Sequence, residues 1–352
     1  MPTFTIAVIP GDGVGIEVVS EGRKVLETLA RRDRSLRFRF TLFGWGSAYY
    51  KKHGRMMPAD GLDVLGRFDA IYLGAVGDPT IPDHVTLHGL LFPIRQSFDQ
   101  YVNVRPAFLY AGVPTPLAHK APGSIDMLVV RENTEGEYAD VVGRLYRGPE
   151  AEVAIQTNVF TRHGTERIIR FAFEQARARR KHLTSVTKSN ALAHSMVFWD
   201  EVFQAVSRDY PEVKTSSMLV DAACMNLVRR PEAFDVVVAS NLFGDILTDL
   251  SAAVVGGMGL APAANLNPTR KFPSMFEPVH GSAPDIAGKG IVNPMAAILT
   301  AAMMLDFLGA RRAAARIGKA VASVLAEGKV RTPDLGGRSK TKEVTAAILG
   351  RL

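Results

Sequence analysis

The chain has 352 residues, 47% hydrophobic and 22% charged, a balance that is ordinary for a soluble globular protein and allows two domains or two lobes. No apolar run reaches the roughly 18 residues of a membrane span, and the single cysteine, Cys224, excludes an internal disulfide framework and a cysteine-built metal site. Met1 to Thr3 lead directly into a predicted strand without the apolar segment of a secretory signal, so we expect a cytoplasmic protein.

The net charge of +7 would suit a nucleic-acid partner. The densest basic runs, Arg31 to Arg39 and Arg177 to His182, each follow a segment with helical periodicity, where cations complement the helix dipole. We therefore interpret them as solvated helix ends and expect neither a nucleic acid nor a membrane as a partner. A small polyanionic substrate fits the same charge balance.

The first predicted element is a buried strand from Phe4 to Ile9, followed by a tight turn and an amphipathic helix from about Gly15 to Ala30. The glycines of this turn invite comparison with the dinucleotide-binding fingerprint G-x-G-x-x-G. Ile16 stands where the last glycine of that pattern should be, so the fingerprint is absent. We interpret the turn as close backbone packing at the mouth of a site.

Further short apolar runs, most of them followed by a turn and a helical pattern, predict an α/β fold with a parallel or mixed sheet flanked by helices. These runs cover residues 70–73, 127–130, 183–186, 218–220 and 236–239. Active sites in such sheets lie beyond the carboxyl ends of the strands. The polar residues at those ends are Arg131, Glu132, Lys188, Asp221 and the segment Asn241 to Asp249.

Glu152 to Phe160 shows partial alternation of apolar and polar residues after a turn region from Gly143 to Pro149. This pattern predicts an antiparallel ribbon, which would suit a dimer contact.

Asp245 and Asp249 lie four residues apart in a predicted helix, so their carboxylates stack on one face. A cation between them would relieve the repulsion of two like charges. Alternatively, both aspartates complement the helix dipole, and the spacing alone does not decide between these interpretations. Asp221, at the end of another strand, would complete a hard oxygen site suited to Mg²⁺ or Mn²⁺.

Arg95, Arg105 and Arg131 lie close to otherwise apolar segments, and a converging set of arginines would hold a small di- or tricarboxylate, although each could instead form a salt bridge. Tyr138 is a candidate proton donor, or a packed ring. Lys188 follows a buried strand, and a partly buried lysine beside a metal is suited to act as a general base. Glu277 to Pro294 is rich in glycine and proline and forms a candidate ligand loop.

Six motifs in order along the chain resemble the isocitrate and isopropylmalate dehydrogenase family: IPGDGVGIE, IRQSFDQYVNVRP, RENTEGEY, VTKSNAL, SNLFGDILTDL and EPVHGSAPDIAGKGIVNP. The resemblance implies β-decarboxylating oxidation of a (2R)-hydroxy acid with NAD or NADP and a divalent cation. It also implies a two-lobed isopropylmalate-dehydrogenase-like fold, not a classical Rossmann fold, with active sites shared in a homodimer.

Carried onto matching positions, the resemblance implies that Arg95, Arg105 and Arg131 bind the substrate carboxylates and that Asp221, Asp245 and Asp249 bind Mg²⁺ or Mn²⁺. Lys188 would act as the general base and Tyr138 as the proton donor after decarboxylation, with Lys188 and Asp221 contributed by the partner subunit. The family's cofactor residues correspond to Glu277, His280, Gly281, Ala283, Asp285 and Asn293.

Asp285 resembles the acidic residue that NAD-dependent members place on the adenosine ribose, where its charge would repel a 2′-phosphate, so we expect NAD. The segment His88 to Ile94 has no serine, threonine or asparagine, which disfavours isocitrate. Several segments resemble the branch that oxidises tartrate or D-malate, with 3-isopropylmalate as the alternative substrate.

We expect a discontinuous large lobe with the cofactor loops, formed by residues 1–99 and 256–352. The small lobe, residues 100–255, would carry the metal-ligand aspartates and a dimerisation arm at about 140–162.

Overall fold

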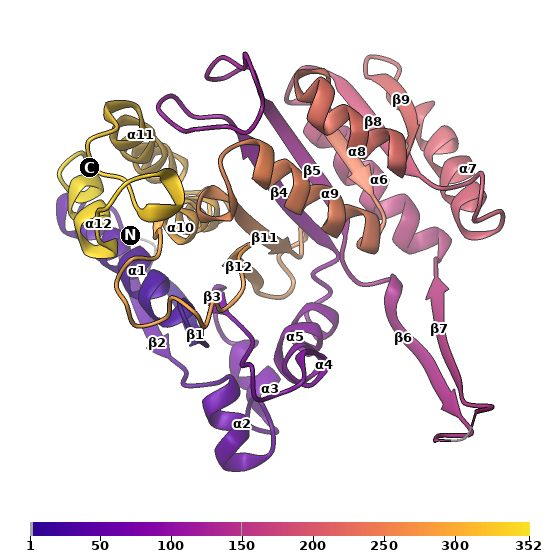
Figure 1. Cartoon of the computed structure of the whole chain (residues 1–352), viewed down its shortest axis with the longest axis horizontal. Coiled ribbons are helices and arrows are strands. Elements are labelled where there is room, and N and C mark those ends of the chain that lie inside the picture. Colours follow the sequence, from indigo (N-terminus) through magenta and orange to yellow (C-terminus); the bar gives the residue numbers. More distant parts are fainter. Residues whose placement is uncertain (1–2, 149) are drawn as a thin grey trace. The chain divides into compact units, whose positions relative to one another are not determined.

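The computed structural model describes residues 3–148 and 150–352, and Figure 1 traces the whole chain. Three residues that the sequence predictions include lie outside the described residues: Met1 and Pro2 before the first predicted strand, and Pro149 at the end of the predicted turn. No described helix is long and apolar enough to cross a membrane. The chain divides into two compact units and passes between them four times, after Gln100, Arg105, Ile125 and Ser251.

The first unit comprises the residues up to Gln100, Pro106–Ile125 and the residues from Ala252 onward. Its strands follow the order β2-β1-β3-β12-β11. Their bounds are β1 Thr3–Gly11, β2 Arg37–Leu42, β3 Ala70–Ala75, β11 Pro262–Leu266 and β12 Ser274–Pro278. β11 is antiparallel to β12, whereas the other pairs are parallel. The sheet is therefore mixed, as the sequence predicts.

The helices of the first unit differ in how much of their circumference is apolar. α1 (Gly15–Arg32) is amphipathic, whereas α10 (Met295–Phe307) is buried almost all round and packs against α1 and α11. The remaining elements are α2 Ser47–His53, α3 Gly61–Leu65, α4 Asp83–Thr86, the π-helix η1 Leu87–Leu91, α5 Phe92–Ser97, η3 Met258–Leu260, α11 Arg311–Glu327, η4 Pro333–Leu335 and α12 Thr341–Leu349.

The second unit comprises Tyr101–Arg105 and Asp126–Ser251. Its strands follow the order β4-β5-β10-β8-β9, with β5, β10, β8 and β9 parallel. Their bounds are β4 Val102–Phe108, β5 Asp126–Glu132, β8 His182–Thr187, β9 Lys214–Leu219 and β10 Val236–Ala239. The helices are α6 Arg162–Arg177, α7 Ser195–Ser207, α8 Val220–Arg229, η2 Pro231–Ala233 and α9 Asn241–Val254.

A two-stranded antiparallel ribbon of β6 (Gly136–Leu145) and β7 (Val153–Val159) extends from the rest of the second unit (Figure 1). The prediction of an antiparallel ribbon is confirmed. The predicted turn from Gly143 onward is wrong at its start, because Gly143, Arg144 and Leu145 continue β6 and pair with Ile155, Ala154 and Val153.

The prediction that the basic runs are solvated helix ends is correct for Arg31 and Arg32 in the last turn of α1 and for Arg177 in that of α6. It is wrong for Arg37 and Arg39, which lie in β2, and for Arg179, which forms ion pairs with Asp126 and Asp235. The sequence predicts that Val220 ends a strand. In the structure β9 stops at Leu219, and Val220 is the first residue of α8.

Residues 106–125 belong to the first unit, whereas the sequence assigned them to the smaller lobe. Gly112 explains part of this difference, because an added Cβ there would lie 2.1 Å from the carbonyl oxygen of Leu325 in α11. The segment therefore lies against the last third of the chain, which local sequence patterns do not reveal.

Candidate active site

Helix α9 follows directly on the buried strand β10, so its first turns lie at the carboxyl end of the parallel sheet of the second unit. Asp245 and Asp249 project from this helix with 38% and 53% of their side chains exposed. Burial raises the pKa of Asp249, and the neighbouring charge of Asp245 raises it further, while Arg105 and Arg131 act in the opposite direction. Burial and the neighbouring carboxylate thus both disfavour the charged form of Asp249, and the two arginines offset part of this effect.

Two buried arginines face these carboxylates. Arg105 on β4 lies 3.3 Å from Asp245 and 3.7 Å from Asp249, measured from guanidinium nitrogen to carboxylate oxygen. Arg131 on β5 forms an ion pair with Asp245. Neutral groups hold the arginines as well, since Arg105 donates to Asn103 at 2.9 Å and to Thr248 at 2.7 Å. The second unit thus gathers two cations and two anions beside β4, β5 and α9.

Tyr138, near the start of β6, joins this group through its ring. The guanidinium carbon of Arg131 lies 5.5 Å from the ring centroid, a cation–π contact. Glu132 follows Arg131 in the chain but turns away from the cluster. Its carboxylate accepts hydrogen bonds from the backbone of Thr134 and Glu135 at 2.9 and 2.8 Å, so it shapes the turn that follows β5.

Lys188 and Asp221 form a separate pair in the second unit. Lys188 follows β8, Asp221 lies in the first turn of α8, and their charged atoms are 2.6 Å apart. This hydrogen bond lowers the pKa of Asp221. Across residues 3–148 and 150–352, no three His, Cys, Asp or Glu side chains form a group that could hold a metal ion. Within one chain, Asp221 therefore does not join Asp245 and Asp249.

Arg95 belongs to the first unit, on α5, where it is buried and forms an ion pair of 2.7 Å with Glu277 of β12. Asn265 donates a second hydrogen bond of 2.8 Å to the same carboxylate oxygen of Glu277. The Nε of Arg95 has no hydrogen-bond partner among the described residues. A buried guanidinium donor without a partner fits a site for an anionic ligand.

The first unit also contains a cavity of about 300 Å³. Three of the six residues assigned to the cofactor line it: His280, Ala283 and Asn293. Glu277 is bound to Arg95, the carbonyl of Gly281 bonds to His280, and Asp285 is exposed on the loop. Ile286, Ile291 and Val292 of the predicted ligand loop also line the cavity. The remaining lining residues, which the sequence does not indicate as cofactor-binding, are Val14, Gly259, Pro333 and Asp334.

His280 is the most informative residue in this cavity. Its Nδ1 lies 3.0 Å from the carbonyl oxygen of Gly281, so Nδ1 carries the proton and Nε2 is an acceptor. That Nε2 is buried without a hydrogen-bond partner among the described residues. Burial also lowers the pKa of His280, which keeps the ring neutral. An unsatisfied acceptor in a cavity fits a ligand that donates a hydrogen bond, such as an adenine amino or ribose hydroxyl group.

The glycine-rich turn after β1 packs against the cofactor loop. The amide of Val14 donates to the carbonyl of Ser282 at 2.8 Å. Gly13 has a φ of +53°, and an added Cβ would lie 2.0 Å from that same carbonyl oxygen. The interpretation of this turn as close backbone packing is confirmed.

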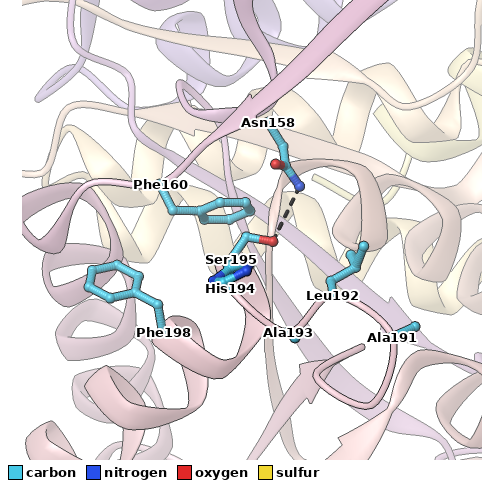
Figure 2. A pocket seen from close by; sticks show the side chains of 8 residues that line it. All are labelled: Asn158, Phe160, Ala191, Leu192, Ala193, His194, Ser195 and Phe198. Carbon is cyan, nitrogen blue, oxygen red and sulfur yellow. Dashed lines mark hydrogen bonds between the residues drawn. The ribbon is translucent and has the colours of Figure 1, made fainter.

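A second cavity, of about 660 Å³, lies in the second unit beside the amino end of α7 (Figure 2). None of the predicted site residues lines it. Its wall comes from the end of the ribbon and from the segment after Lys188, and Asn158 donates to Ser195 across it at 3.3 Å. The lining residues are Asn158, Phe160, Ala191, Leu192, Ala193, His194, Ser195 and Phe198.

Comparison with known proteins places this geometry in a family. The family model for isocitrate/isopropylmalate dehydrogenase matches residues 5–348. A probable tartrate dehydrogenase/decarboxylase of Bacillus subtilis is 54% identical over 353 residues, covering 100% of this chain and 99% of that protein. The D-malate dehydrogenase [decarboxylating] of Escherichia coli is 55% identical over 356 residues, covering 99% and 98%.

Among solved structures, the isocitrate dehydrogenase from Methylococcus capsulatus superimposes with a TM-score of 0.89 at 37% identity, covering 99% of both chains. The match spans both units and nearly the whole sequence. The chain belongs to the isocitrate/isopropylmalate dehydrogenase family.

Proposed function

We propose that this protein is an NAD- and divalent-metal-dependent dehydrogenase that oxidises a (2R)-hydroxy dicarboxylic acid, either tartrate or D-malate, with or without loss of the β-carboxylate. The observation that carries the proposal is the convergence of Arg105 and Arg131 on Asp245 and Asp249. Such a cluster offers cations to substrate carboxylates and hard oxygens to a metal ion. Relatives with these two substrates in their names are 51–55% identical over almost the full chain.

The arginines would recognise the two carboxylates of the substrate. A guanidinium binds a carboxylate through two parallel hydrogen bonds, and burial strengthens such a bond. Arg131 is only 3% exposed, so a substrate carboxylate bound there would be well shielded from water. The family resemblance implies the same role for Arg95, whose Nε has no hydrogen-bond partner among the described residues.

The acidic residues would hold Mg²⁺ or Mn²⁺, since carboxylate oxygens are the ligands that these hard cations prefer. Asp245 and Asp249 provide two carboxylates, and Asp221 of a partner subunit would provide the third. When bound, the cation would polarise the substrate's hydroxyl and carbonyl oxygens. Lys188 would accept the hydroxyl proton as hydride leaves, and Tyr138, beside Arg131, would protonate the product carbon after decarboxylation.

The cavity at His280 would receive the adenosine part of NAD. The unpartnered Nε2 of His280 would accept a hydrogen bond from the cofactor, and the apolar wall formed by Val14, Ile286 and Val292 would pack against the adenine ring. Asp285, which is exposed on the same loop, would repel the 2′-phosphate of NADP. This charge argument favours NAD.

We further propose that the protein is a homodimer with shared active sites and that it works in the cytoplasm, where its single cysteine would stay reduced. Large apolar side chains are exposed on the ribbon and on α8, and a second copy of the chain would cover them. They are Val141, Val142, Leu145, Tyr146, Val153 and Ile155 on or beside the ribbon, and Met225 and Val228 on α8.

The segment His88 to Ile94 bears on the substrate. Leu90 and Ile94 are fully buried in the core of the first unit, and Leu91 is only 8% exposed. These apolar side chains are therefore committed to packing rather than free to surround an isopropyl group. This favours a small polar hydroxy acid and leaves 3-isopropylmalate as the alternative substrate.

Formation of NADH in the presence of Mn²⁺ tests the proposal. We expect turnover with D-malate or a tartrate isomer, loss of turnover with a metal chelator, and much weaker turnover with 3-isopropylmalate. Release of CO₂, measured in the same assay, separates oxidation alone from oxidation with decarboxylation. Turnover of 3-isopropylmalate alone would refute the assignment of tartrate or D-malate.

A further inference from the structure

The guanidinium of Arg131 is fixed by a neutral side chain as well as by an acidic one. Its Nε and Nη2 both donate to Oδ1 of Asn241, at 3.0 and 2.7 Å. Arg131 is 3% exposed and Asn241 2%, so water does not compete strongly for these bonds. Two donors of one planar group that meet one acceptor restrict both the position and the tilt of that plane.

The orientation of the Asn241 amide is determined by its two neighbours. Its Nδ2 donates to the backbone carbonyl of Glu135 at 3.0 Å. A guanidinium cannot accept a hydrogen bond and a carbonyl cannot donate one, so only this orientation of the amide satisfies both sides. Asn241 therefore links Arg131 to a fixed point on the backbone.

That backbone point is itself held on both sides. The amide of Glu135 donates to the buried carboxylate of Glu132 at 2.8 Å. The carboxylate of Glu135 accepts from the amide of Thr161 at 2.9 Å, and Thr161 caps the amino end of α6. Gly164 makes room for this contact, because an added Cβ would lie 2.3 Å from the carboxyl carbon of Glu135.

We propose that Asn241 is a positioning residue that aims Arg131 at the substrate carboxylate, an inference that rests on the substrate-binding role proposed for Arg131. A neutral acceptor is suited to this task, because it fixes the guanidinium without cancelling its charge. An aspartate at the same place would hold Arg131 equally close but would compete with the substrate for its charge. Glu135 and Glu132 act through Asn241 by fixing the carbonyl to which its amide donates.

The test compares Asn241→Ala with Asn241→Asp. Removal of the amide should raise the KM for the hydroxy acid by about tenfold or more, the loss expected when a buried charged donor loses its partner. The KM for NAD should stay unchanged. Asn241→Asp retains the acceptor but adds a charge and loses the donor to Glu135, so it should raise the same KM at least as much. Full recovery of the KM in Asn241→Asp would overturn the argument for a neutral acceptor.

Asn267→Ala is the matched control, because Asn267 is also 2% exposed and hydrogen-bonded, in the first unit. It should lower the midpoint of thermal unfolding without changing the KM for the hydroxy acid. In an Arg131→Lys background, Asn241→Ala should have little further effect, because the group that it positions is gone. An equal change of the KM in both backgrounds would show that Asn241 acts independently of Arg131 and would overturn the positioning role.

A second measurement separates this inference from the proposed function. Hydrogen exchange of the Arg131 Nε–H, followed by NMR and assigned with Arg131→Lys, requires no turnover. It should be slow in the unsubstituted protein and fast in Asn241→Ala. If the protein oxidises neither tartrate nor D-malate, the proposed function fails while this contrast still supports the positioning role. Rapid exchange before any substitution would overturn the positioning role.

Discussion

His280 links the chemistry of a single residue to the stability of the cofactor cavity. Burial lowers the pKa of its imidazole below the ordinary value of 6.5. As the pH falls below 6.5, the unfolded chain therefore binds a proton before the folded chain can do so. By linkage, the stability that neutral His280 supports is present above this pH and is lost as the pH falls toward the lowered pKa.

We predict that His280→Gln weakens the acid sensitivity of folding. Glutamine does not titrate, so the free energy of unfolding should fall less between pH 7.5 and pH 5.5 in the variant than in the unsubstituted protein. Urea unfolding at both pH values measures the difference. His84→Gln, which removes an exposed histidine, is the control. An identical pH dependence in the His280 variant and the unsubstituted protein would contradict the prediction.

At the scale of elements, the approach of α9 to β5 depends on a glycine. An added Cβ at Gly244 would lie 2.6 Å from both Cβ and Cγ of Arg131. These atoms belong to the base of the side chain, which cannot swing away without moving β5. The helix therefore lies close enough for Asn241 and Asp245 to reach the guanidinium of Arg131.

We predict that Gly244→Ala destabilises the protein by about 1–3 kcal/mol, the usual cost of overpacking, although alanine favours helices. Gly318→Ala in α11 is the control, because no heavy atom lies within 4 Å of the added Cβ. That variant should gain up to about 1 kcal/mol from helix propensity. Denaturant unfolding measures both changes, and equal stabilisation of the two variants would disprove the close packing at Gly244.

Elements with strong local signals were predictable. The strand at Val236–Ala239 was predicted with its observed bounds, because four consecutive small apolar residues suit a strand buried on both faces. The start of α8 was missed, because Val220 favours a strand locally and only the end of β9 at Leu219 shows otherwise. Residue type and motif identify the aspartates and arginines as candidates without any knowledge of their contacts.

Contacts between distant segments could not be predicted. Asp334 lines the cofactor cavity and accepts a hydrogen bond of 3.0 Å from Asn293, but it lies 41 residues further along the chain, in the short 3-10 helix η4, which has no chemical signature. The role of Asn241 likewise depends on which neighbours its amide meets. Sequence spacing alone does not give that information.

At the scale of the whole molecule, the central question is whether one chain can complete a site. Asp221 forms an ion pair with Lys188. Among the described residues it does not form a group of three metal-binding side chains with Asp245 and Asp249. The proposed homodimer resolves this, since each subunit would lend its Lys188 and Asp221 to the other. Catalysis would then require two chains.

We predict that two inactive variants restore activity when they are co-expressed. Lys188→Met leaves the aspartates of α9 intact, and Asp245→Asn leaves Lys188 and Asp221 intact. Random pairing should give one native site in each mixed dimer, and hence about a quarter of the unsubstituted activity. Co-expression of Lys188→Met with Asp221→Asn should restore no activity, because both substitutions affect the residues that each subunit contributes to the active site of its partner. No recovery from the first pair would refute shared active sites.

The discontinuous first unit also constrains how the protein can fold during synthesis. β3 pairs in parallel with β12, with Ala70 opposite Ser274. This edge of β3 therefore stays unpaired until β12 has been synthesised. The stretch Asp126–Ser251 is complete earlier and can fold while the first unit still lacks β11, β12 and α10. If translation stopped before β12, the released chain would expose an unpaired edge of β3 to other chains. Interrupted translation would therefore lead to aggregation and not to a truncated but active enzyme.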